Sequence, residues 1–247
     1  MPISPNQGST GGGTTVTITG TNLANATAVK FGSKLATITA NTPTSVTVTS
    51  PSGAGVVDVT VTTSGGTSNP LSFFYVGAPF KSALNITSGP TGGGNTITIT
   101  GTGLSTASAV NFGANAATPT VISDSQLSVT VPAGSGPGAV SVSVTTAGGT
   151  NNGLSYTYVD TPTVTTLSPN SGSTSGGTAV TITGTNLTTT QSVTFDGVTA
   201  PFFVVNSTTM SVVTPPGTAG AVDVVVTTTG GSATEVGGFT YVGGPGI

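Results

Sequence analysis

The chain of 247 residues contains no cysteine, histidine, tryptophan or arginine. Without cysteine there can be no disulfide, no thiolate metal site and no thiol nucleophile. Without histidine there is no imidazole base for a Ser-His pair and no imidazole metal ligand. Because these absences remove the side chains on which many active sites depend, the sequence predicts a protein that is not an enzyme and that carries no metal or cofactor.

Charge is also scarce, since charged residues make up 4% of the chain and the formal net charge is −3. A typical soluble domain carries roughly 25% charged residues. Three lysines cannot form a basic patch for a phosphate backbone, so nucleic acid is not expected as a partner. Disordered chains combine high charge with low hydrophobicity, whereas 34% of this chain is hydrophobic. The composition therefore predicts a folded protein.

Long apolar runs are missing as well. No run approaches the roughly 20 residues that a membrane-spanning helix needs, so membrane insertion is not expected. The first residues, Met1–Asn6, show neither the positive region nor the apolar region of a signal peptide. An export route is therefore not visible in the sequence.

The sequence contains one pattern of residues that occurs three times. An alternating threonine and aliphatic segment recurs as Thr15–Gly20, Thr96–Gly101 and Ala179–Gly184. A closing segment recurs as Phe74–Val76, Thr157–Val159 and Thr240–Val242. The steps of about 80 residues are too long for solenoid repeats, whose units run roughly 20–50 residues. We therefore predict three whole domains, spanning residues 1–78, 79–160 and 161–247.

Each domain is expected to be all-β. In the first, short runs of apolar residues at every second position are bounded by Gly, Pro, Asn or Ser, whereas helical periodicity is absent. These runs contain Val16 and Ile18, Val29 and Phe31, Val46 and Val48, Val57–Val61, and Phe73 and Tyr75. Several short strands without crossover helices predict an antiparallel β-sandwich of immunoglobulin type. Thr faces should point to water and Val/Ile faces to the core.

The order of turn residues and strand segments resembles that of the IPT/TIG domain, an immunoglobulin-like module. Its order here is Ser4-Pro5-x-x-Gly8, a Gly run, V-T-I-T-G-T-N-L from Val16 to Leu23, V-x-F-G ending at Gly32, and a Pro turn at Pro51. The resemblance covers residues 3–242 in three copies. It implies a module found in cell-surface receptors, some transcription factors and bacterial surface and carbohydrate-active proteins. The family shares a fold rather than an active site.

The few carboxylates do not form a convincing catalytic pair. Asp58 and Asp223 occupy the same outward strand position in the first and third domains, where the second domain has Ser141. This substitution favours a solvated strand face over a catalytic role. Asp160, at a domain junction, could contribute to a calcium site, but a lone Asp is more often a linker residue because Ca²⁺ takes six to eight oxygens. The Gly runs lack a following helix and indicate turns rather than phosphate loops.

The junctions between domains are short and contain proline. Val76–Phe80 joins the first domain to the second, and Val159–Thr163 joins the second to the third. Such linkers limit bending, so we expect the three domains to form an elongated, semi-rigid rod. The segment Val242–Pro245 repeats the start of the first linker, although no fourth domain follows in this sequence.

At the other end, the first domain starts with fewer strand-forming residues than the second and third. An incomplete first strand and a spare linker predict head-to-tail self-association, by β-augmentation or another heterologous contact. The expected contact residues are Met1, Pro2, Ile3, Gly243, Gly244, Pro245, Gly246 and Ile247. The alternative is that both ends were cut from a longer array of domains.

From these features we expect a non-enzymatic structural protein, a subunit of an extracellular or cell-surface fibre assembled head-to-tail. One alternative is an adhesin or carbohydrate-binding module with a glycan or other cell-surface ligand in the loops at one end of a sandwich. Another is a fibre or decoration protein of a phage or virion, which would explain the missing signal peptide.

Overall fold

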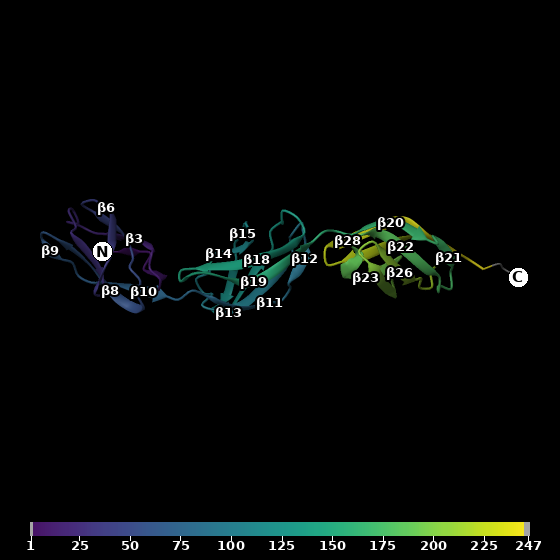
Figure 1. The fold of residues 1–247 in the computed structure, drawn as a ribbon, viewed down its shortest axis with the longest axis horizontal. Coiled ribbons are helices and arrows are strands. Elements are labelled where there is room, and N and C mark those ends of the chain that lie inside the picture. Colours follow the sequence, from purple (N-terminus) through teal and green to yellow (C-terminus); the bar gives the residue numbers. More distant parts are fainter. Residues whose placement is uncertain (1, 245–247) are drawn as a thin grey trace. The chain divides into compact units, whose positions relative to one another are not determined.

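The computed structural model describes residues 2–244 and confirms an all-β protein built from three immunoglobulin-like sandwiches (Figure 1). Within these residues the only helical element is a single 3₁₀ turn, η1 (Leu187–Thr189). Each sandwich contains two sheets, one of four strands and one of five or six. The semi-rigid rod remains a prediction.

In the first domain the four-stranded sheet has the order β1 (Ile3–Ser4), β3 (Thr15–Thr19), β7 (Ser45–Thr49) and β6 (Thr37–Asn41). The second sheet has the order β2 (Gln7–Ser9), β10 (Leu71–Val76), β8 (Gly55–Thr63), β4 (Ala28–Phe31) and β5 (Lys34–Leu35), with β9 (Gly66–Thr67) beside β8. All recorded pairs are antiparallel except β2 with β10, which is parallel.

The second domain repeats this topology. Its first sheet has the order β11 (Phe80–Leu84), β13 (Thr96–Thr102), β17 (Gln126–Thr130) and β16 (Thr120–Ser123). Its second sheet has the order β12 (Ser88–Pro90), β19 (Gly149–Val159), β18 (Gly138–Thr146), β14 (Ala109–Phe112) and β15 (Asn115–Ala117). Again one pair, β12 with β19, is parallel.

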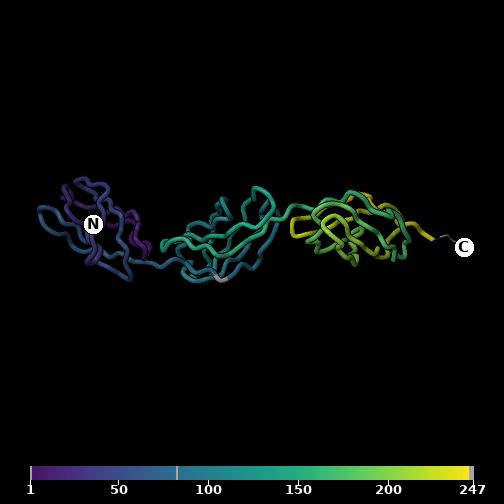
Figure 2. The backbone as a smooth tube through the Cα atoms, in the orientation of Figure 1, coloured from purple at the N-terminus to yellow at the C-terminus, as the bar shows by residue number. Residues whose placement is uncertain are grey.

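The third domain follows the same plan. Its first sheet has the order β20 (Thr163–Ser168), β22 (Ala179–Thr185), β26 (Thr209–Val213) and β25 (Phe202–Asn206). Its second sheet has the order β21 (Ser171–Ser173), β28 (Gly231–Val242), β27 (Gly220–Thr228), β23 (Thr190–Phe195) and β24 (Val198–Ala200). Figure 2 shows the yellow end of the chain leaving this domain after β28.

The alternating pattern of β3 explains why it is a strand. Val16 and Ile18 are fully buried, whereas the threonines between and around them lie at the surface or half-buried. Val16 pairs with Val48 and Ile18 with Val46 across β7, so two aliphatic rows face the core together. A shift of one residue would turn this apolar face to water, which fixes the register. The prediction of inward Val/Ile and outward Thr is confirmed here.

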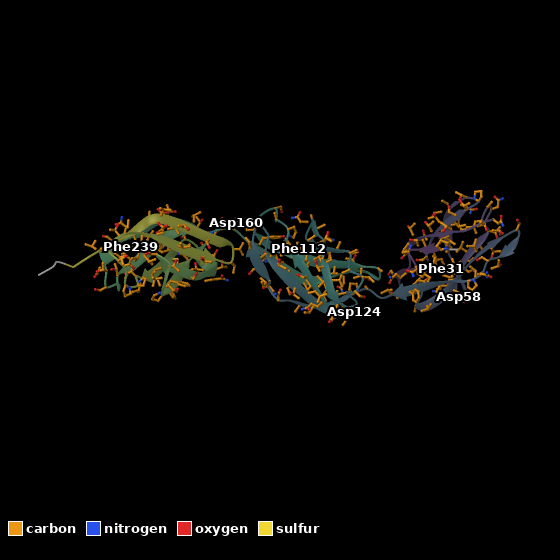
Figure 3. The ribbon with its side chains drawn as sticks, turned by 180° about the vertical axis from the view of Figure 1, so that it is seen from behind. Phe31, Asp58, Phe112, Asp124, Asp160 and Phe239 are labelled. Carbon is orange, nitrogen blue, oxygen red and sulfur yellow. The ribbon has the colours of Figure 1, made fainter. Side chains whose placement is uncertain are left out.

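Aromatic rings complete each core (Figure 3 labels one in each domain). In the third domain, Phe239 lies 5.3 Å from Phe195 and 5.1 Å from Tyr241 between ring centroids, both in edge-to-face geometry. The first domain repeats this arrangement with Phe31, Phe73 and Tyr75. Edge-to-face pairs add roughly 0.5–1.5 kcal/mol beyond the burial of their area.

The tyrosine that closes each core has a specific partner in the proline-containing turn. The hydroxyl groups donate to the backbone oxygens of that turn at 2.6–2.7 Å: Tyr75 to Pro51, Tyr158 to Pro132 and Tyr241 to Pro215. These bonds tie the last strand of each domain to a turn of the opposite sheet. All four tyrosines, Tyr75, Tyr156, Tyr158 and Tyr241, have a pKa that burial raises above the ordinary tyrosine value.

These raised pKa values predict a loss of stability at alkaline pH. A folded-state pKa above the unfolded value means that protonated tyrosine contributes stability below pH ~10, which is lost as pH rises through the folded-state pKa values. We expect spectrophotometric titration to show tyrosine ionising only above the ordinary range, together with unfolding. Reversible ionisation of the four side chains at the ordinary pKa, with the fold intact, would contradict this account.

Candidate assembly site

The contacts expected from the sequence lie partly within the described residues. The Pro2 carbonyl accepts a hydrogen bond from the Thr19 amide at 3.0 Å, and Ile3 pairs with Ile18 and packs against the core of the first domain. Gly243 and Gly244 are exposed and follow β28 without regular structure. The remaining four, Met1, Pro245, Gly246 and Ile247, lie outside the described residues. Self-association through these residues remains a prediction.

The first strands of the three domains differ in length. β1 has two residues, whereas β11 has five and β20 has six. The additional residues pair with the end of the neighbouring strand: Lys81 is opposite Gly101 on β13, and Val164 is opposite Gly184 on β22. The corresponding strand of the first domain, β3, ends at Thr19.

In the second domain, the linker residues that precede β11 lie on the turn between β18 and β19. A Cβ atom added to Gly148 in this turn would fall on the carbonyl oxygen of Gly77, so the linker backbone touches the glycine directly. The Asn151 amide, next to the turn, donates to the carbonyl oxygen of Pro79. Gly148 therefore allows the linker to approach the turn closely.

The third domain holds its own linker in the same way. A Cβ atom on Gly230, in the turn between β27 and β28, would fall on the carbonyl oxygen of Asp160. The Asn186 side-chain amide donates to the carbonyl oxygen of Thr161 at 2.9 Å. Asn186 is in the left-handed region, with φ of 57°, a conformation that Asn adopts more readily than most residues. The glycine turns of the second and third domains therefore both contact the linker that precedes their own domain.

The first domain has the corresponding glycine turn and the corresponding Asn. Gly65 corresponds to Gly148 and Gly230, and a Cβ atom on it would have only the Thr63 hydroxyl within 4 Å, at 3.6 Å. Asn22 corresponds to Asn186 and has the same φ of 57°. Both residues line a cavity of about 410 Å³, which we call the first-domain socket, defined by Thr21, Asn22, Leu23, Gly65, Gly66 and Ser68.

Two carboxylates, Asp124 in the second domain and Asp160 in the linker that follows it, accept hydrogen bonds. Asp124 accepts hydrogen bonds from the amides of Gly103 and Ser105 at 3.1 and 3.4 Å, and these bonds lower its pKa, the Gly103 bond most. Asp160 accepts one from the Thr91 hydroxyl at 2.6 Å. Among residues 2–244, no cluster of three or more acidic, cysteine or histidine side chains could hold a metal ion.

The strand carboxylates lie where the sequence placed them. Asp58 on β8 and Asp223 on β27 are exposed, as a solvated strand face requires, and belong to different domains (Figure 3 labels Asp58). The Asp223 carboxylate accepts the Gly237 amide at 2.8 Å.

Lys81 is buried, which no pattern in the sequence indicates. Only 7% of this side chain is exposed, and its amino group donates to the carbonyl oxygen of Val142 on β18. Burial lowers the pKa of Lys81 below the ordinary lysine value. In the third domain the corresponding residue is Val164, which packs against the core. Strand β11, which follows the first linker, therefore has an inward-facing second residue, Lys81.

Comparison with known proteins identifies the repeated module. A family model described as "IPT/TIG domain" matches residues 1–75, 79–158 and 162–241. No curated protein sequence matches. In the described residues, no helix has the length and apolar character needed to cross a bilayer.

Among solved structures, the full extracellular region of Plexin A4 is 20% identical with a TM-score of 0.51, covering 93% of this chain and 22% of that one. The chain therefore spans about a fifth of that relative. FdeC, an Escherichia coli adhesin, is 16% identical with a TM-score of 0.33, covering 97% and 92%. A Bacteroides ovatus protein, SGBP-B, in complex with a mixed-linkage heptasaccharide, is 18% identical with a TM-score of 0.32, covering 96% and 65%.

Proposed function

Because the chain belongs to the IPT/TIG domain family, we propose that it is a non-enzymatic structural protein, the subunit of an extracellular fibre assembled head-to-tail. The three matched domains account for nearly the whole of this sequence. The observation that carries the proposal is the repetition of one immunoglobulin-like module three times in series, over residues 1–75, 79–158 and 162–241.

The outer strands of the first four-stranded sheet, β1 and β6, each pair with a single neighbouring strand among the described residues. An unpaired strand edge is a template for β-augmentation. A contact between two different surfaces of identical subunits builds an open filament when its rotation does not close a ring. With nine charged residues in 247, few like-charge contacts oppose close approach of the subunits.

The experiment that tests this function is a concentration series of the purified chain at neutral pH. We expect the weight-average mass in sedimentation to rise with concentration and electron micrographs to show filaments. Monodisperse single particles at the highest concentration would overturn the fibre proposal.

A second candidate is a glycan-binding or adhesive role, favoured by a cavity of about 380 Å³ in the third domain. Its walls combine polar groups, Thr174 and Asp196, with Phe195 and Tyr241, a mixture suited to a small polar ligand. Binding on a glycan array that is lost in Asp196→Asn would support this role. Asp196 has φ of 49°, and asparagine tolerates that conformation, so the variant keeps the turn.

A third candidate is a fibre or decoration protein of a phage or virion, which genome neighbourhood would distinguish. Under each of these roles we propose an extracellular or surface location.

A further inference from the structure

We propose that the third domain binds an alkylammonium group, such as the side chain of a lysine from a partner polypeptide. The site is the cavity of about 380 Å³ that favours the second candidate function, here called the third-domain cavity and defined by Thr174, Phe195, Asp196, Val198, Pro216 and Tyr241. The proposal rests on that second candidate function, names the chemistry of its ligand, and is independent of fibre assembly.

One wall of the third-domain cavity has a counterpart in the first domain that carries a lysine. Val198 is the first residue of β24 and lies opposite Phe195 on β23. Lys34 is the first residue of β5 and lies opposite Phe31 on β4. The two positions therefore correspond, with valine in the third domain and lysine in the first.

The facing wall also has a counterpart. Pro216 directly follows the proline whose carbonyl oxygen accepts the Tyr241 hydroxyl. Ser52 directly follows the proline whose carbonyl oxygen accepts the Tyr75 hydroxyl. Pro216 and Ser52 therefore occupy the same place in the turn that closes each core.

In the first domain, the Lys34 side chain spans these two walls. Its ammonium group donates to the carbonyl oxygen of Ser52 at 2.8 Å and to the hydroxyl oxygen of Ser52 at 3.2 Å. In the third domain, the Val198 side chain carries no donor, and the Pro216 carbonyl oxygen accepts no hydrogen bond from residues 2–244. The third-domain cavity thus presents to another molecule the acceptor that the first domain uses for its own alkylammonium group.

The charge of the third domain favours a cation. Residues 161–247 include the carboxylates of Asp196, Asp223 and Glu235 but no lysine or arginine. Asp196 lines the cavity at a position where the first and second domains have Gly32 and Gly113. The three positions correspond because each amide donates at 2.8–2.9 Å to the matching carbonyl oxygen on the neighbouring strand. A cationic ligand is therefore attracted to the third domain.

The Asp196 carboxylate is available to such a ligand. It has no hydrogen-bond or ion-pair partner in the described part of the chain, whereas the Asp223 carboxylate accepts the Gly237 amide. Asp-Gly is a favoured pair in a two-residue hairpin turn, so the turn accommodates Asp196 without using its carboxylate. A bond between this carboxylate and an ammonium group is charge-assisted, and such bonds are stronger than neutral ones.

The apolar part of the cavity suits an alkyl chain better than a sugar ring. The rings of Phe195 and Tyr241 are 1% and 2% exposed, so neither offers an open face for stacking. Val198 is 49% exposed and presents an aliphatic surface. Lysine stems commonly lie along such surfaces while the charged end bonds to polar groups.

Titration of the full chain with n-butylammonium chloride, followed by NMR in dilute solution, tests the proposal. We expect saturable binding that weakens as the salt concentration rises, and no binding of n-butanol, the neutral analogue. Val198→Lys should abolish binding, because its own ammonium group takes the place that Lys34 takes in the first domain. Asp196→Asn should lower the affinity by about fivefold or more.

Glu235→Gln is the matched control, since it removes the same charge from the same domain at a residue outside the third-domain cavity. Its affinity should stay within about twofold of that of the unchanged chain. Two further probes distinguish the sources of the ammonium group. We expect Nα-acetyl-lysine methylamide to bind more tightly than glucosamine, and the reverse order would sustain the ammonium site but assign it to an amino sugar.

Three results would overturn the ammonium site: no binding of n-butylammonium, equal affinity in Val198→Lys and the unchanged chain, or equal affinity in Asp196→Asn and Glu235→Gln. Binding of glucose without binding of n-butylammonium would also overturn it, while sustaining a glycan-binding role for the cavity. Filament formation is measured separately by the concentration series, so its failure leaves the ammonium site intact.

Discussion

Phe239→Ala is expected to destabilise the third domain by about 3–5 kcal/mol, the usual cost of truncating a buried aromatic side chain. Phe239 is fully buried and packs edge-to-face against both Phe195 and Tyr241. Its removal leaves a cavity and releases Tyr241, whose hydroxyl bond to Pro215 closes the core. For a domain of this size we expect the corresponding calorimetric transition to fall by more than about 10 °C.

Val236→Ala is the matched control. Val236 lies on the same strand, β28, but its aliphatic side chain is 79% exposed. Its transition should stay within about 0.5 kcal/mol of the unchanged chain, as is usual for surface substitutions. An equal effect of the two variants would mean that the aromatic cluster does not stabilise the sandwich.

Gly230→Ala and Gly65→Ala should differ strongly although they change the same turn position in two domains. In Gly230→Ala the new Cβ atom meets the Asp160 backbone, which has to move, at a cost of about 1–3 kcal/mol for overpacking. The strand that follows, β20, begins at Thr163, so the displaced linker should also become more sensitive to proteases. In Gly65→Ala the nearest atom is 3.6 Å away, and we expect no loss of stability.

Thermal unfolding and limited proteolysis of the two variants in dilute solution measure this difference. Neither glycine has a positive φ, so backbone strain contributes to neither result. Equal stability of the two variants would show that the linker backbone does not pack against Gly230.

The strands were predictable because alternation of threonine and aliphatic residues is a local signal, and three copies repeat it. β3, with Val16 and Ile18 inward, follows from this pattern alone. The Pro51 turn was also recognisable, but its role as the acceptor for Tyr75 was not, because the two are 24 residues apart and meet only through the packing of the sheets.

The candidate site was predictable in outline only. The repeat pattern predicted Ile3 and Gly243 as contact residues for self-association. The surface around them could not be predicted, because it depends on tertiary contacts. Gly148 and Gly230 read as ordinary turn residues in the sequence; their contact with a linker carbonyl is visible only in three dimensions. Lys81 was missed for the same reason, since nothing nearby in the sequence indicates that its strand buries it.

The absence of cysteine permits the most direct test of head-to-tail assembly. Pro2→Cys in one preparation and Gly244→Cys in another are mixed and oxidised, and a disulfide can form only where the two Cα atoms come within about 7 Å. The pair Thr163→Cys with Thr185→Cys, in a single chain, is the positive control, because the two threonines are directly opposite across β20 and β22 and their hydroxyl oxygens lie 2.8 Å apart. We predict that the mixture yields a disulfide-linked dimer of the two variants, whereas Asp58→Cys, on an exposed strand face, gives no such dimer with Gly244→Cys. Efficient crosslinking of the control pair with no dimer in the mixture would contradict the central claim.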